Sequence, residues 1–132
     1  MRILGIDLGK KRIGLALGDT ESRIAIGLPT MQNDQHVAEN LQAVIEGERI
    51  KRLIVGLPKT MSGATGKQVG YTQKWASKIS ALLGVEVVYE DERLSSKMAR
   101  DGLLSLGGKL KKEDIDQAAA VLILQSYLDR SA

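Results

Sequence analysis

The chain has 132 residues, the size of a single domain, and its net charge of +3 permits a polyanionic partner without requiring one. It contains no cysteine, which excludes disulfides, thiolate metal sites and cysteine nucleophiles. Its one histidine, His36, excludes a multi-histidine metal cage and any Ser–His–Asp hydrolase that does not use this residue. Acid–base or metal chemistry must therefore come from carboxylates.

The N-terminal segment, Met1 to Asp7, carries an acid where a signal peptide would still be apolar. No apolar run approaches the ~18 residues that a membrane-spanning helix needs. We therefore expect a cytoplasmic protein that does not contact a membrane and that folds as one domain over residues 1–132.

Short apolar runs rich in β-forming residues predict five strands, at residues 2–7, 13–19, 23–29, 52–56 and 85–89. We expect the first two to form a hairpin and the third to lie on a sheet edge. The run at 52–56 is continuously apolar, which is typical of a central strand covered on both faces.

Apolar residues at helical spacing predict the helices. The first covers about 34–48 with Asp34 as its cap. The second ends at Gly84 and places on one face Trp75, Ile79, Leu82 and Leu83. A short helix to about residue 106 and a last helix at about 113–129 follow. This order implies an α/β fold with one mixed sheet, an antiparallel meander plus parallel strands, and helices on both faces.

The 14 glycines suggest a nucleotide-binding loop, but no such motif is complete. No two glycines stand at i and i+2, so the G-x-G-x-x-G fingerprint of a dinucleotide site is absent. Gly66-Lys67 resembles the end of a P-loop, but Gln68 follows where Ser or Thr is required, and Met61 stands where the first Gly belongs.

Acidic residues stand at three places where elements end or begin. Asp7 ends the first predicted strand, Asp91 and Glu92 end the last, and Asp114 and Asp116 open the final helix. If the first and last strands are neighbours, their ends converge, and a helix crossing that end adds a third acid. Three carboxylates repel strongly unless a divalent cation neutralises them. Oxygen ligands without sulfur or imidazole fit Mg²⁺ or Mn²⁺, and two such ions about 3.5–4 Å apart can promote phosphodiester hydrolysis.

Each acid also has a simpler interpretation. A single Asp at a strand end is usually a turn or cap residue, and Glu90-Asp91-Glu92 suits a solvated rim. Asp114 is best explained by the preference of helix N-termini for negative charge. The metal-site hypothesis depends on several acids coinciding in one fold.

Four segments resemble, in order, the YqgF/RuvX family of resolvases and ribosomal-RNA nucleases, which have an RNase H-like fold. They are Asp7-Leu8-Gly9-Lys10-Lys11-Arg12-Ile13-Gly14-Leu15-Ala16, Ile54-Val55-Gly56-Leu57-Pro58 with Met61-Ser62-Gly63, Asp91-Glu92-Arg93-Leu94-Ser95-Ser96, and Ile115-Asp116-Gln117-Ala118-Ala119-Ala120. The resemblance covers nearly the whole chain. Two places depart from the family pattern: Lys59-Thr60, where the family usually has Leu-Asn, and Ser96, where Thr is common.

The resemblance implies that Asp7, Glu92 and Asp116 are both the catalytic residues and the metal ligands, with Asp7 bridging the ions. The second ligand comes from the pair formed by Asp91 and Glu92. Strand residues alternate between faces, so only one of the two can point into the site. We favour Glu92 and keep Asp91 as its alternate, because the sequence does not fix the strand register.

Basic residues near these acids are candidate contacts to nucleic acid. The candidate nucleic-acid-binding residues are Gly9, Lys10, Lys11, Arg12, Lys59, Lys97, Lys109, Lys111 and Lys112. The glycine allows close approach of the backbone to a phosphate, and contacts from Lys and Arg hold phosphates without reading sequence. One Trp, three Tyr and no Phe leave few platforms for base stacking, which favours recognition of structure and phosphates.

The expected function is a divalent-metal-dependent nuclease, a hydrolase acting on structured nucleic acid. The resemblance implies the 5′ end of precursor 16S ribosomal RNA as substrate and the ribosome as a partner. The alternatives are a Holliday junction resolvase acting on branched DNA, which would be a stable C2 dimer, and a non-catalytic nucleic-acid- or ribosome-binding module. An ATP-binding protein of the actin and sugar-kinase type would need two domains, for which 132 residues are too few. The sequence leaves open whether the chain is a monomer or a homodimer.

Overall fold

The computed structural model describes residues 1–58, 66–92, 98, 101–102 and 111–130. The strands are β1 (Arg2–Leu8), β2 (Arg12–Asp19), β3 (Ala25–Gln32), β4 (Ile50–Leu57) and β5 (Glu86–Asp91). The helices are α1 (Val37–Gly47), α2 (Lys67–Leu83) and α4 (Lys112–Arg130). Apart from residues 98, 101 and 102, the predicted short helix at about 95–106 lies outside the described residues.

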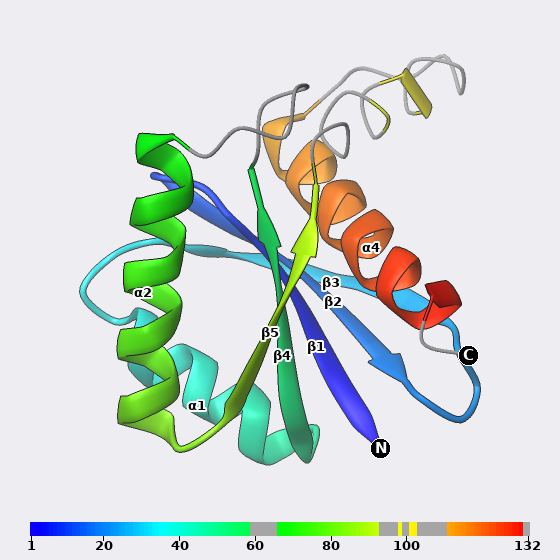
Figure 1. Ribbon diagram of the computed structural model, residues 1–132, viewed down its shortest axis with the longest axis horizontal. Coiled ribbons are helices and arrows are strands. Elements are labelled where there is room, and N and C mark those ends of the chain that lie inside the picture. Colours follow the sequence, from blue (N-terminus) through cyan, green and yellow to red (C-terminus); the bar gives the residue numbers. More distant parts are fainter. Residues whose placement is uncertain (59–65, 93–97, 99–100, 103–110, 131–132) are drawn as a thin grey trace.

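The strands form one mixed sheet in the order β3-β2-β1-β4-β5. β1 pairs antiparallel with β2, and β2 with β3, while β1, β4 and β5 run parallel (Figure 1). The predicted fold class is therefore confirmed, and β3 lies on an edge as expected. The first and last strands are not neighbours, however. The chain returns through α1 to place β4 against β1, so β4 separates β1 from β5.

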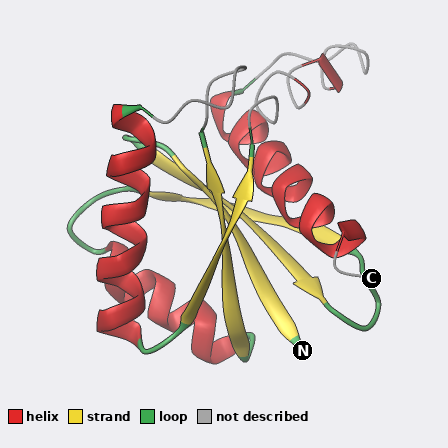
Figure 2. Cartoon of the chain, in the orientation of Figure 1, coloured by secondary structure: helices red, strands yellow, loops and turns green. Residues whose placement is uncertain are grey.

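Helices cover both faces of the sheet (Figure 2). α1 and α2 lie on one face over a core of large aliphatic side chains, including Leu4, Ile6, Leu15, Leu41, Leu53 and Val55. α4 crosses the other face over a smaller core that includes Ile3, Ala16, Ile54, Ala120, Ile123, Leu124 and Leu128. β4 contributes to both cores, as its continuous apolar run predicted.

The local sequence explains where α1 begins and where α2 ends, and α1 and α2 each differ from the prediction at one point. α2 ends at Gly84, whose φ of 66° is the left-handed conformation that glycine adopts without strain. α1 begins at Val37 rather than near residue 34, because the Asp34 carboxylate accepts a hydrogen bond from the His36 N–H (2.9 Å) in a turn before the helix. Of the residues expected on the apolar face of α2, Ile79 is buried and Trp75 and Leu83 pack against the core, but Leu82 is 66% exposed. Val69, Thr72 and Ala76 complete the buried face.

Candidate active site

The acids predicted from the sequence come together at the end of the sheet where the parallel strands finish. Asp7 is the penultimate residue of β1, and Glu92 follows directly after β5. The beginning of α4, which carries Asp116, crosses this same end of the sheet (Figure 1). β4 separates β1 from β5, but it does not keep Asp7 and Glu92 apart, because it carries Gly56 beside the Glu92 side chain.

Gly56 of β4 leaves the space through which Glu92 reaches Asp7. A Cβ placed on Gly56 would lie 2.8 Å from Cδ of Glu92 and 3.0 Å from its Oε2, so the carboxyl group lies over the backbone of β4. The Glu92 N–H donates to the carbonyl oxygen of Leu57 (3.1 Å), which continues the β4–β5 pairing by one bond. The carboxyl group that extends from this fixed backbone is hydrogen-bonded to Asp7.

Gly14 of β2 leaves the space in which the backbone of Asp116 approaches the sheet. It stands opposite Asp7 in the β1–β2 register, and a Cβ there would lie 2.0 Å from the carbonyl oxygen of Asp116. Only glycine lets the first turns of α4 approach the sheet so closely. Asp116 begins the sheet-facing stripe of α4, which repeats every four residues through Ala120, Leu124 and Leu128.

Both carboxyl groups of the Asp7–Glu92 pair have raised pKa values. Burial raises the pKa of Asp7 to about 6; its hydrogen bond with Glu92 opposes this rise and the negative charge of Asp116 adds to it. Burial, followed by the charge of Asp7, raises the pKa of Glu92 to about 9. At neutral pH the pair thus holds one proton, with Glu92 donating its hydrogen bond to the Asp7 carboxylate.

Asp116 is close to this pair but its carboxylate is engaged elsewhere. Its Oδ2 accepts from Nε of Arg12 at 2.8 Å, and both side chains are about four-fifths buried. Within the described part of the chain, no group of three or more His, Cys, Asp or Glu side chains is arranged to hold a metal ion. The structure therefore brings Asp7 and Glu92 together and places Asp116 beside them in an ion pair.

The alternation of β5 separates Glu92 from Asp91. Glu90, two residues before Glu92, is buried against α4, where Ser126 donates to it (2.9 Å) and Arg130 forms an ion pair with it. Asp91 pairs in register with Leu57 and is exposed. The interpretation of residues 90–92 as a solvated rim is therefore wrong for Glu90, whose carboxylate fixes α4 to β5.

The candidate nucleic-acid contacts are distributed around this end of the sheet. In the β1–β2 turn, the Gly9 N–H donates to the Arg12 carbonyl oxygen (3.0 Å), and Lys10 and Lys11 are exposed. Lys111 and Lys112 are exposed at the start of α4. Arg12 pairs with Asp116, as described above. Three further candidates lie outside the described residues: Lys59, Lys97 and Lys109.

Three residues that build the site carried no predicted role: Gly14, Gly56 and Asn33. Gly14 and Gly56 fall within the predicted strands, and both lie on the face that α4 covers. The signal was the alternation of small residues along β2, where Gly14, Ala16 and Gly18 share one face. Asn33 had no such signal, but its amide donates to the Gly9 carbonyl oxygen (2.8 Å) and its N–H to that of Lys11 (2.9 Å), which closes the β1–β2 turn.

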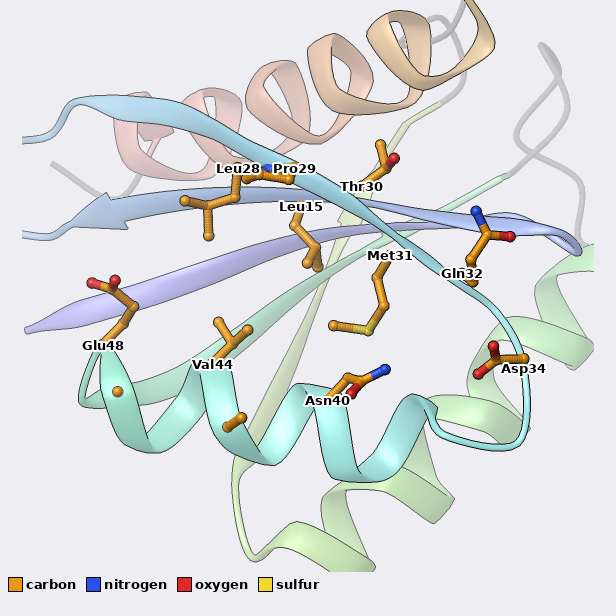
Figure 3. A pocket seen from close by; sticks show the side chains of 12 residues that line it. Leu15, Leu28, Pro29, Thr30, Met31, Gln32, Asp34, Asn40, Val44 and Glu48 are labelled. Carbon is orange, nitrogen blue, oxygen red and sulfur yellow. The ribbon is translucent and has the colours of Figure 1, made fainter.

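A groove of about 640 Å³ lies away from these acids, between β3 and α1 (Figure 3). Met31 points from β3 toward α1, and Val44 points from α1 toward the sheet. None of the three candidate acids is among its described lining residues. The groove is therefore separate from the candidate site formed by Asp7, Glu92 and Asp116.

The donor set at this edge fits a hard divalent cation. Asp7 and Glu92 offer oxygen ligands only, and a divalent cation would take the place of the proton that the pair holds at neutral pH. Asp116 would be available as a further ligand on leaving Arg12. These three residues would hold the ion.

Comparison with known proteins adds the family. A family model described as "RuvX: Holliday junction resolvase" matches residues 1–130. A protein of Sulfurihydrogenibium sp. (strain YO3AOP1), named as a candidate pre-16S rRNA nuclease, is 40% identical over 98% of this chain and 90% of its own length. A protein of the same name from Chloroflexus aggregans is 42% identical over 96% of this chain and 92% of its own length.

Solved structures agree on the fold. RuvC of Thermus thermophilus, in a structure titled as a complex with a Holliday junction substrate, matches with a TM-score of 0.60 at 16% identity. The match covers 100% of this chain and 97% of RuvC, which establishes a shared RNase H-like fold. Over the described residues, no helix is both long enough and apolar enough to cross a membrane. On the full-length family match and the identities of its relatives, this chain belongs to the RuvX family.

Proposed function

We propose that this chain is a divalent-metal-dependent nuclease whose active site is built on Asp7, Glu92 and Asp116. The observation that carries the proposal is the hydrogen-bonded pair of Asp7 and Glu92, two largely buried carboxyl groups brought together although like charges repel. Such pairs are characteristic of sites where chemistry or cation binding offsets their cost. The family and the names of its curated members support nuclease chemistry over other uses of a carboxylate pair.

Mg²⁺ or Mn²⁺, as a pair of ions in the two-metal arrangement, is the cofactor that these ligands suit. When bound, the metal supplies activation of water and stabilisation of charge on the phosphodiester. Asp7 and Glu92 would hold it, and Asp116 would contribute once its carboxylate leaves Arg12. Arg12 would then be free to donate to a substrate phosphate, a contact that a guanidinium makes with two parallel hydrogen bonds.

The substrate that we favour is the 5′ end of precursor 16S ribosomal RNA. The names of the relatives support this choice. Lys10, Lys11, Lys111 and Lys112 surround the acids with exposed positive charge. A protein with this role acts in the cytoplasm, on the ribosome or its precursor.

Cleavage of branched DNA is the second candidate, because the family model is described as a Holliday junction resolvase. A resolvase must cut two strands symmetrically, which a stable C2 dimer accomplishes. The two activities therefore differ in both substrate and assembly, and sedimentation of the protein with a four-way DNA junction would separate them.

The decisive experiment compares adjacent acids. Purified wild type, Asp7→Asn, Glu92→Gln and Asp91→Asn are incubated with a precursor 16S RNA fragment and, in parallel, a four-way DNA junction, with Mg²⁺, Mn²⁺ or EDTA. We expect Asp7→Asn and Glu92→Gln to lose cleavage by a factor on the order of 100 or more, the effect of removing one preorganised electrostatic group. Asp91→Asn should retain cleavage because Asp91 is exposed on the opposite face of β5.

Thermal melting provides the control for folding. Removing one of two adjacent acids relieves repulsion, so Asp7→Asn should melt at the wild-type temperature or above it in EDTA. Millimolar Mg²⁺ or Mn²⁺ should raise the melting temperature of the wild type more than that of Asp7→Asn. Cleavage that persists in EDTA or in both acid variants would rule out the proposed site, and binding without any cleavage would favour a non-catalytic module.

A further inference from the structure

The exposed surface of α2 contains a hollow of about 250 Å³ that the acid site does not include. Its described lining residues are Tyr71, Lys74, Trp75 and Lys78. They follow one another at i, i+3, i+4 and i+7, so they share one face of the helix. Tyr71 is 41% exposed, and Trp75 packs one side against the core while its remainder lines the hollow. Two aromatic rings thus alternate with two exposed lysines along this face.

The charge of the molecule is concentrated on this helix. α2 contains three lysines and no acidic residue, whereas α1, which covers the same face of the sheet, contains two glutamates and no basic residue. Outside α2, the chain has 16 basic and 16 acidic residues, so α2 alone accounts for its net charge of +3. A polyanion is therefore attracted to α2 rather than to α1.

Asn33 links one end of the hollow to the β1–β2 turn, which follows Asp7. The Asn33 amide donates to the carbonyl oxygen of Gly9 (2.8 Å) and to the hydroxyl of Tyr71 (3.5 Å). Gly9 is two residues beyond Asp7, and Lys10 and Lys11 project from the same turn. The β1–β2 turn also lies beside the N-terminal half of α2 in the fold (Figure 1). Exposed lysines of the β1–β2 turn and of α2 therefore lie on the two sides of this link.

We propose that a single-stranded segment of the nucleic-acid substrate binds along α2, with a base stacked on the Tyr71 and Trp75 rings and phosphates contacting Lys74 and Lys78. This inference rests on the proposed nuclease function and names a part of its substrate. An unpaired strand is required because the bases of a duplex are stacked on each other and do not present their faces to protein aromatic rings. Stacking on exposed aromatic rings between lysines is the manner in which single strands are bound without sequence preference.

Trp75 is the only tryptophan in the chain, so its fluorescence reports directly on the hollow. The titration uses full-length Asp7→Asn protein in EDTA, which prevents cleavage, and a 12-nucleotide single-stranded RNA, with a blunt RNA duplex of equal length as comparison. We expect the single strand to quench Trp75 fluorescence and the duplex to quench it much less. Tyr71→Ala should weaken single-strand binding by about ten-fold, the effect of losing one stacking partner.

The lysines are tested by the dependence of binding on salt. Each phosphate contact to a single strand contributes about 0.7 to the slope of log affinity against log salt concentration. Lys78→Gln should lower that slope by this amount and the Lys74→Gln/Lys78→Gln double variant by about twice as much. Lys51→Gln is the matched control, because Lys51 is also exposed but lies at the start of β4 and is not among the described lining residues of the hollow. It should leave the slope unchanged.

Two results would overturn the inference: Trp75 fluorescence that does not respond to the single strand, or equal salt slopes for Lys78→Gln and Lys51→Gln. The failure of the proposed function is a separate outcome, observed as wild-type protein that binds the single strand through Trp75 but cleaves no substrate with metal. If cleavage is intact and unaffected by Tyr71→Ala and the double lysine variant, the nuclease function stands and the strand path along α2 is wrong. Circular dichroism of each variant confirms that it is folded.

Discussion

The two faces of the sheet are built from different residues and serve different purposes. The face under α1 and α2 carries large aliphatic side chains, among them Leu4, Ile6, Ile13, Leu15, Leu53 and Val55. The face under α4 carries small residues, among them Gly5, Gly14, Ala16, Gly18 and Gly56. The same strands produce both faces because successive side chains alternate between them.

This difference shows how a small fold separates stability from function. Each fully buried aliphatic side chain contributes about 1.5–3 kcal/mol, so the α1/α2 face supplies most of the hydrophobic stabilisation. The α4 face forgoes some of that burial, and in exchange the backbone of α4 and the side chain of Glu92 come close enough to reach Asp7. Three substitutions test this separation, in order of decreasing effect on stability.

The largest effect is expected from truncation on the aliphatic face. Leu41 of α1 is fully buried, so Leu41→Ala should lower the free energy of unfolding by about 2–5 kcal/mol. Because Leu41 packs on the face opposite the acids, cleavage per folded molecule should be unchanged. Urea denaturation and a cleavage assay corrected for the folded fraction measure the two quantities. A loss of cleavage in fully folded protein would mean that the two faces are not functionally separate.

A smaller loss of stability but a larger loss of activity is expected from Gly14→Ala. The added methyl group meets the Asp116 backbone, with its carbonyl oxygen at 2.0 Å, so the first turns of α4 must move. Such overpacking costs about 1–3 kcal/mol, and a displacement near 1 Å at a catalytic group can lower the rate about 100-fold.

Gly18→Ala is the control on the same face. Its added methyl group would meet side-chain ends, Leu124 Cδ2 at 2.9 Å and Leu128 Cδ1 at 3.2 Å, which rotate at lower cost than a backbone moves. It should therefore retain most of the cleavage. Equal activity losses in the Gly14 and Gly18 variants would contradict the view that position 14 specifically positions Asp116.

The smallest effect at neutral pH is expected from Glu92→Gln, because the carboxyl group that it replaces is already protonated there; its effect is seen in the pH dependence of stability without metal. Folding raises the pKa of Asp7 from 3.8 to about 6 and that of Glu92 from 4.5 to about 9. A raised pKa in the folded state stabilises the protein below the unfolded value, and this contribution is lost as pH rises through the folded value. Metal-free wild type should therefore lose stability between pH 5 and pH 9.

Glu92→Gln removes the acid with the larger shift, so its melting temperature should depend less on pH over this range. Glu39→Gln, which changes an exposed acid on α1, is the control and should follow the wild type. Melting curves in EDTA at several pH values provide the comparison. Identical slopes for wild type and Glu92→Gln would show that this carboxyl group is not buried in a shared site.

Several features were predictable from the sequence because they depend on local pattern. The strands and long helices follow from apolar periodicity and from stop signals such as Gly84. The mixed sheet with helices on both faces follows from the order of those elements. Positions at strand ends and near the start of the last helix made Asp7, Glu92 and Asp116 candidates, together with Asp91 and Asp114, and the family resemblance chose among them.

Only the tertiary structure decided how these parts meet. It placed β4 between β1 and β5, so the acids approach each other across Gly56 and not between neighbouring strands. It paired Arg12 with Asp116, which are 104 residues apart, and joined the aromatic rings of α2 to the β1–β2 turn through Asn33. These relations depend on which distant segments pack together, and that is set by the summed packing of the whole core, so no local pattern in the sequence records them.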